Sequence, residues 1–238
     1  MDPSLFHLFR TLTPAEALLL LQPKDTKRRT LLQLTLQDLL QKHVLKLNLE
    51  GPPEEEKVWI ALGSSSARYV YKAHEEMLLR PLEKQAGNRL LFRDYIKILV
   101  ERSWPDKRFK FEIIGRTPEL VPFFRQTGWK QWFQIQALNR HGQETSKLLR
   151  EALIKAENQF QENISKEDLK KMLSSLGSHI LLLDGMTDAL LDEIKLALTG
   201  KFNSITGYSI SLKNASGEMY QETGEIDSPV NFERTGYA

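Results

Sequence analysis

The stretch LTLQDLLQKHVLKLNLEGPPEEEKVWIAL, residues 34–62, decides the fold, because its hydrophobic period changes partway along it. Its first part carries leucines at helical spacing, and we predict a helix over residues 36 to about 46, with Thr35 as the N-cap. The polar face opposite the leucines is expected to be open to solvent, and it consists of Gln37, Asp38, Gln41, Lys42 and Lys46.

The second part of the stretch predicts a β-hairpin. From Val44 onward apolar and polar residues alternate, which is the period of a strand. Gly51 and the two prolines after it predict a turn, and residues 57–62 return as a strand rich in Val, Trp and Ile.

Another helix is predicted just before this stretch. Thr13, Pro14 and Glu16 form a helix-start pattern, in which Thr13 caps, Pro14 suits the first helical position and Glu16 closes a capping box. An apolar run follows, and Pro23 ends it. The resulting order of helix, helix, strand, turn and strand predicts a winged-helix-like unit over residues 1–66.

The rest of the chain predicts a mainly α protein, with a helical body over residues 67–202 and a polar, flexible tail over residues 203–238. Residues 109–114 alternate and predict a short strand, and Thr117 begins a second helix-start pattern. The helices predicted by apolar spacing cover about 73–85, 90–102, 145–161, 165–176 and 187–198.

The composition is that of an ordinary water-soluble protein, with 41% hydrophobic and 27% charged residues among 238. The chain has no cysteine, which excludes disulfides, thiolate zinc sites, iron–sulfur clusters and a cysteine nucleophile. No apolar run approaches the roughly 20 residues that a bilayer core requires. We therefore expect a cytoplasmic protein.

Charge is unevenly distributed along the chain. Residues 1–150 carry a net charge of +8, and residues 151–238 carry −6. This asymmetry indicates either an acidic partner for the first part or attraction between the two parts of the chain.

The sequence carries no motif that commits it to a reaction. It has neither a Gly-rich phosphate loop nor a nucleophile elbow, and its five histidines are scattered, without the spacing of metal ligands. We therefore expect no catalytic residues, no cofactor and no metal, with an enzyme lacking a short motif as an open alternative.

Basic residues around the second predicted helix are the candidates for binding an anionic ligand: Lys24, Lys27, Arg28, Arg29, Lys42 and Lys46. In a winged helix this face enters the DNA major groove while the hairpin tip contacts the backbone. Here the tip carries Glu54, Glu55 and Glu56, which phosphate would repel.

Residues 15–21 form a leucine-rich helix, residues 24–29 a charged connector, and residues 34–49 a second helix that leads into a strand. In this order the chain resembles the opening of the Golgi phosphoprotein 3 family. The resemblance implies a mostly helical fold, a hairpin used in self-association and binding of phosphorylated phosphoinositide headgroups. The family's small-residue turn is replaced by Lys42, His43 and Val44, and no lipid-binding residue carries over.

Together these patterns favour a non-enzymatic interaction protein. Its winged-helix-like unit would bind a protein partner, with a second copy of the chain, and hence a homo-oligomer, as one alternative. Another alternative is an anionic surface, either DNA or a membrane with phosphorylated lipid headgroups. Phosphate binding weakens steeply with salt, whereas an apolar protein interface does not.

Overall fold

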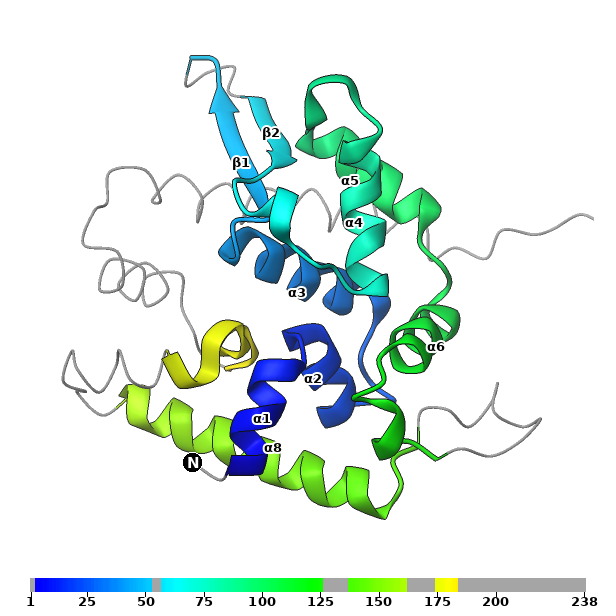
Figure 1. Ribbon diagram of the computed structural model, residues 1–238, viewed down its shortest axis with the longest axis vertical. Helices are drawn as coiled ribbons and strands as arrows, with labels where there is room; N and C mark the ends of the chain where they lie inside the picture. The colour runs from blue at the N-terminus through cyan, green and yellow to red at the C-terminus, as the bar shows by residue number, and fades with distance from the viewer. Residues whose placement is uncertain (1–2, 53–56, 126–136, 162–173, 184–238) are drawn as a thin grey trace, which may run out of the picture.

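A computed structural model describes residues 3–52, 57–125, 137–161 and 174–183 of the chain (Figure 1). The protein is mainly helical, with N-terminal helices, a three-stranded antiparallel sheet and further helices. The sequence predicts this order of elements and two of the three strands. The helices are α1 (Pro3–Thr11), α2 (Pro14–Leu21), α3 (Arg28–Gln41), α4 (Ala73–Glu83), α5 (Phe92–Arg102), α6 (Asp106–Arg116) and α8 (Arg140–Gln161). The strands are β1 (Leu45–Glu50), β2 (Lys57–Leu62) and β3 (Arg89–Leu91), and the short 3-10 turns are η1 (Ser66–Arg68), η2 (Ala86–Asn88), η3 (Val121–Phe123) and η4 (Gly177–Leu182).

The start of α2 follows the predicted chemistry. The Glu16 N–H donates to the Thr13 hydroxyl at 3.3 Å, and the Thr13 N–H donates to the Glu16 carboxylate at 2.7 Å. Pro14 occupies the first helical position. The predicted capping box is therefore confirmed.

Helix α3 is longer than predicted and begins earlier. It starts at Arg28, so Thr35 lies mid-helix, where its hydroxyl donates to the Leu31 carbonyl at 2.7 Å instead of capping an N-terminus. Leucines fall on several sides of this segment and nearly all are buried, so tertiary packing extends the helix beyond its amphipathic part. The predicted bounds, residue 36 to about 46, were wrong at both ends, since α3 ends at Gln41 and Lys46 lies in β1. Arg28 and Arg29 belong to α3 instead of to a connector.

The C-terminus of α3 is a Schellman motif that leads directly into the sheet. The Val44 N–H donates to the Leu39 carbonyl, and the His43 N–H donates to the Leu40 carbonyl. His43 has φ 55°, the left-handed conformation that this motif requires. The chain turns there and enters β1.

The predicted hairpin is confirmed, and β3 extends it to the order β1-β2-β3. Leu47 pairs with Ile60, and Ile60 pairs in turn with Leu90. Apolar side chains of this face rest on the helices, with Leu45, Leu47 and Ile60 almost fully buried. Strand β3 lies beyond residue 66, which is the predicted end of the winged-helix-like unit. The sheet therefore contains strands from both the predicted N-terminal unit and the predicted helical body.

Helices α4, α5 and α8 confirm the predictions near residues 73–85, 90–102 and 145–161. Helix α8 starts earlier than predicted, because Asn139 accepts a hydrogen bond from the Gly142 N–H at 2.8 Å and caps it. The predictions for residues 187–198, for the tail and for most of 165–176 lie outside the described residues.

The strand predicted at residues 109–114 was wrong, since α6 spans it. Phe109, Ile113 and Ile114 are buried at helical spacing, whereas Phe111 is only partly buried. The helix start predicted at Thr117 was also wrong. Before the described range ends at residue 125, the short η3 is the one helical segment that follows it, and the Thr117 hydroxyl donates to the Glu16 carboxylate instead.

Helix α3 lies at the centre of the described structure. Figure 1 shows the sheet, α4 and α5 on one side of it and α1, α2, η4 and α8 on the other. Buried apolar side chains from all these elements form one connected core.

Candidate functional site

The six predicted basic residues differ in how exposed their side chains are and in whether they already have a partner. Lys24, Lys27 and Lys46 are exposed. Arg28 donates to the Trp104 carbonyl at 3.0 Å and lies 3.7 Å from the Asp106 carboxylate.

Arg29 is half-buried and already has a partner. Lys42 bonds to the buried Asp38 carboxylate at 2.6 Å. Two of the six thus pair with named carboxylates, which lowers their availability to an anion.

The structure does not gather the six residues into one patch. Lys24, Lys27, Arg28 and Arg29 lie at the start of α3, whereas Lys42 and Lys46 follow its end. The 14 residues of α3 separate the two groups by roughly 21 Å.

Helix α3 presents almost no surface to a ligand. Thr30 and Gln41 are its only exposed residues, and the others are half-buried or buried. The predicted solvent-facing side is wrong for Asp38, which is 0% exposed, and for Gln37, which is half-buried. A recognition helix needs an open face to enter the major groove, and α3 lacks one.

The hairpin is the element that extends from the body (Figure 1). Strand β1 forms one edge of the sheet, and no other strand of the described ranges pairs with its outer side. The Gly63 N–H donates to the Val44 carbonyl at 2.7 Å, so the backbone carbonyl of Val44 points toward the β2 side. By the antiparallel alternation, the N–H and C=O groups of Leu45, Leu47 and Leu49 point outward.

A side-chain brace stiffens the outer face of this sheet. The Arg89 guanidinium lies 4.5 Å from the centre of the Trp59 ring and donates to the Glu50 carboxylate at 2.8 Å. These contacts connect β3 to β1 across β2, so the edge is held as a well-defined strand.

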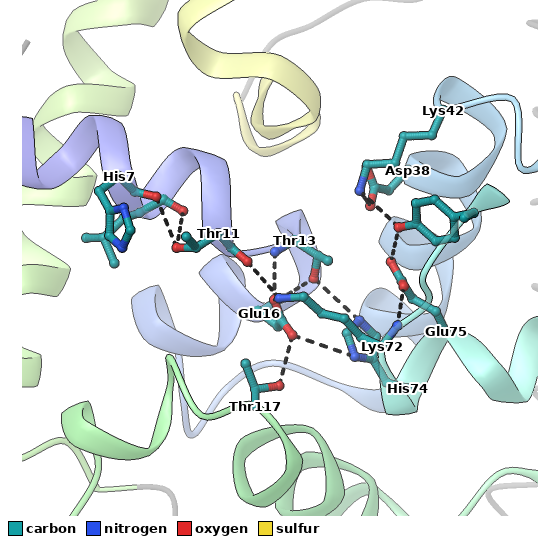
Figure 2. A network of polar contacts seen from close by, with 12 residues as sticks. His7, Thr11, Thr13, Glu16, Asp38, Lys42, Lys72, His74, Glu75 and Thr117 are labelled. Atoms are coloured by element: carbon teal, nitrogen blue, oxygen red, sulfur yellow. Dashed lines mark hydrogen bonds and ion pairs between the residues drawn. The ribbon is translucent and has the colours of Figure 1, made fainter. Parts of the chain in front are cut away.

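A polar cluster lies inside the body, around Glu16 (Figure 2). The Glu16 carboxylate is 0% exposed and accepts hydrogen bonds from Lys72 Nζ at 2.5 Å and Thr117 Oγ1 at 2.9 Å. His74 Nδ1 lies 3.8 Å from the same carboxylate, and His74 Nε2 lies 3.4 Å from Thr13 Oγ1. The cluster joins the start of α2, the start of α4 and the end of α6.

A second buried carboxylate continues the cluster toward α3. Glu75 accepts from the Tyr69 hydroxyl at 2.9 Å and from the Lys72 N–H at 2.7 Å. The Tyr69 hydroxyl lies 3.4 Å from the Lys42 ammonium, which bonds to Asp38. Figure 2 shows Asp38 and Lys42 beside each other, with Glu75 and Lys72 nearby.

Burial and neighbouring charge set the protonation states in this cluster. Burial lowers the pKa of His74 to about 4, although the Glu16 carboxylate opposes the shift. Burial alone would raise the pKa of Glu16, but His74, Lys72 and the Thr13 N–H hold it below its usual value. Burial raises the pKa of Glu75.

The chemistry of the cluster is structural: it connects α2, α4 and the end of α6, and we call it the joint at Glu16. Every oxygen of Glu16 already accepts hydrogen bonds from the protein, and the His74 side chain is only 2% exposed. Of its members, sequence reasoning found only the capping pair, Thr13 and Glu16. The contacts with residues 72, 74 and 117 join segments that are distant in the sequence, so no local sequence pattern predicts them.

The described residues contain no group of three or more His, Asp or Glu side chains placed to hold a metal ion. None of their helices is long and apolar enough to cross a bilayer.

Comparisons with models of known protein families, with curated proteins and with solved structures gave no significant match to this chain.

Proposed function

We propose that the protein is a non-enzymatic interaction protein that binds a protein partner by adding a strand to the outer edge of β1. The observation that carries the proposal is the outward row of backbone groups at Leu45, Leu47 and Leu49, which no other strand of the described ranges pairs. Such an edge is a ready template for another strand.

The partner that best fits this edge is a second copy of the chain. Two identical edges pair in an antiparallel sense about a two-fold axis, which is the commonest symmetry of homo-oligomers. The Leu49 side chain is 40% exposed on the otherwise buried face of the sheet. A second β1 strand would cover part of that apolar surface.

The experiment that tests the proposal is the oligomeric state as a function of protein concentration, by sedimentation equilibrium. Leu49→Pro removes an outward N–H at the edge, where proline is tolerated, and Leu49→Ala is the matched control that shortens the same side chain but keeps the N–H. We expect the wild type and Leu49→Ala to self-associate and Leu49→Pro to be largely monomeric.

Circular dichroism would establish that both variants keep the wild-type fold. A wild-type protein that stays monomeric at high micromolar concentration would contradict self-association. So would a Leu49→Pro variant that associates as strongly as Leu49→Ala.

A further inference from the structure

We infer that two copies of β1 pair about a two-fold axis at Asn48, so that Lys46 of each copy lies opposite Glu50 of the other. The inference rests on the proposed self-association and goes beyond it, because it specifies one register and the two side chains that select it.

The pleat of β1 limits the allowed registers. Only Leu45, Leu47 and Leu49 direct their backbone groups outward, so hydrogen-bonded pairs across the axis must join odd-numbered residues. A register displaced by one residue would place outward groups against groups that already bond to β2. The remaining choices differ by steps of two residues.

Charge separates these remaining registers. The polar face of β1 carries Lys46, Asn48 and Glu50, all on the side of the sheet away from the core. An axis at Asn48 pairs each lysine with the glutamate of the other copy. An axis at Lys46 or at Glu50 opposes like charges, and an axis at Leu47 or at Leu49 places Asn48 opposite a charged residue. Only the Asn48 axis matches opposite charges, which favours cross-strand pairs.

Backbone and apolar contacts agree with this register. Leu47 and Leu49 would form the hydrogen-bonded pairs and exchange both N–H···O bonds with the other copy. Lys46 and Glu50 would form non-hydrogen-bonded pairs, in which side chains approach more closely. The half-exposed Leu49 would lie beside the buried Leu47 of the second copy on the core face.

The charged groups are available for this role. Both side chains are exposed, and Lys46 has no ion pair within the ranges that the structure describes. Glu50 Oε1 accepts from Arg89, and that bond places the carboxylate while its other oxygen can accept from a lysine.

The test uses two charge-reversal variants, Lys46→Glu and Glu50→Lys, alone and mixed. In this register, each variant alone opposes two pairs of like charges, so we expect its dimer to be about tenfold weaker or more than that of the wild type. In an equimolar mixture, Glu at position 46 meets Lys at position 50, and the unchanged Glu50 meets the unchanged Lys46. Every pair across the axis is then opposite in charge. We expect association to be stronger than that of either variant alone but weaker than that of the wild type, because Glu50→Lys also removes the acceptor of Arg89.

Mixing also controls for damage to the fold, because a variant weakened by misfolding would not recover when combined with the other. Thermal unfolding of each variant, measured at a concentration where it is monomeric, gives a second check. A mixture that associates no better than the separate variants, while the wild type does associate, overturns the register and leaves the proposed function standing. A wild type that does not associate overturns both.

Discussion

The carboxylate of Glu16 lies 2.9 Å from the hydroxyl of Thr117, a residue 101 positions further along the chain. The same carboxylate caps its own helix and accepts from Lys72. One buried side chain therefore joins three segments that are distant in sequence.

Replacing Glu16 with Gln should destabilise the protein by about 3–5 kcal/mol, the usual cost of removing one partner of a buried ion pair. The loss arises because the Lys72 ammonium would remain beside the network without its counter-ion. Urea unfolding at neutral pH measures the change. The matched control is Glu144→Gln, which removes an exposed helical pair with Arg140 and should cost about 0.5 kcal/mol or less.

If the two variants lose similar stability, Glu16 does not act as the joint described above.

The stability of the protein should fall as the pH drops from 6.5 toward 4. Burial lowers the pKa of both His74 and His179 from 6.5 to about 4. The unfolded chain therefore takes up protons before the folded one, and stability present above pH 6.5 is lost as the pH falls. At pH 5 each histidine should lower the free energy of unfolding by about 2 kcal/mol relative to neutral pH. The lowered pKa of Glu16 adds a further loss below its usual 4.5, whereas the raised pKa of Glu75 opposes part of the loss.

Unfolding free energies of the wild type and of His179→Phe between pH 7.5 and 5 measure this dependence. We expect a shallower pH profile for His179→Phe, since Phe does not titrate and suits the edge-on packing against Phe9. His7 is exposed, so His7→Gln serves as the control and should keep the wild-type slope. Identical slopes for all three proteins would contradict a role for the buried histidine.

Two glycine-to-alanine substitutions should have opposite effects on stability. A Cβ added at Gly63 would lie 2.1 Å from the His43 carbonyl oxygen, at the base of the hairpin, so the backbone would have to move. We expect Gly63→Ala to cost about 2 kcal/mol or more, as strained backbone sites do. Gly115 lies within α6 with no atom near its added Cβ, so Gly115→Ala should stabilise by about 0.5–1 kcal/mol.

Thermal unfolding of both variants provides the measurement. A Gly63→Ala protein as stable as the wild type would show that the hairpin base can shift without cost.

The alternative that the protein binds an anionic surface leads to a separate prediction. If it binds duplex DNA or anionic vesicles, binding should weaken steeply with salt and should depend on the exposed Lys24 and Lys27. Changing both to Ala should weaken binding, whereas Lys46→Ala, roughly 21 Å away beyond the other end of α3, should have little effect. A titration at low and moderate salt tests this, and absence of binding at low salt rejects the alternative.

Local chemistry predicted the parts of this fold that depend on local contacts. The capping box at Thr13 and the change of period after α3 both describe neighbouring residues, and both predictions were confirmed. In α6, Phe109 and Phe111 alternate over too few residues to separate a strand from a helix, and burial of Phe109 with Ile113 decides for the helix. The three residues of β3 are too few to give a pattern.

The basic residues show a different limit of prediction from sequence, which is that exposure and pairing depend on tertiary packing. Sequence reasoning placed Lys42 on an exposed face, whereas tertiary packing buries its neighbour Asp38 and pairs the two. The outward direction of the β1 backbone, which supports the proposed function, depends on pairing with β2 and on the place of β1 in the sheet. Neither is set by composition or charge.

The joint at Glu16 has a consequence for the growing chain on the ribosome. While residues 1–66 emerge, neither Lys72 nor Thr117 has yet left the exit tunnel, so the Glu16 carboxylate has no counter-ion and resists transfer out of water. The N-terminal helices should thus stay incompletely packed until about residue 117 is available. Nascent chains stopped before that point should remain open to proteases, and longer ones should be protected.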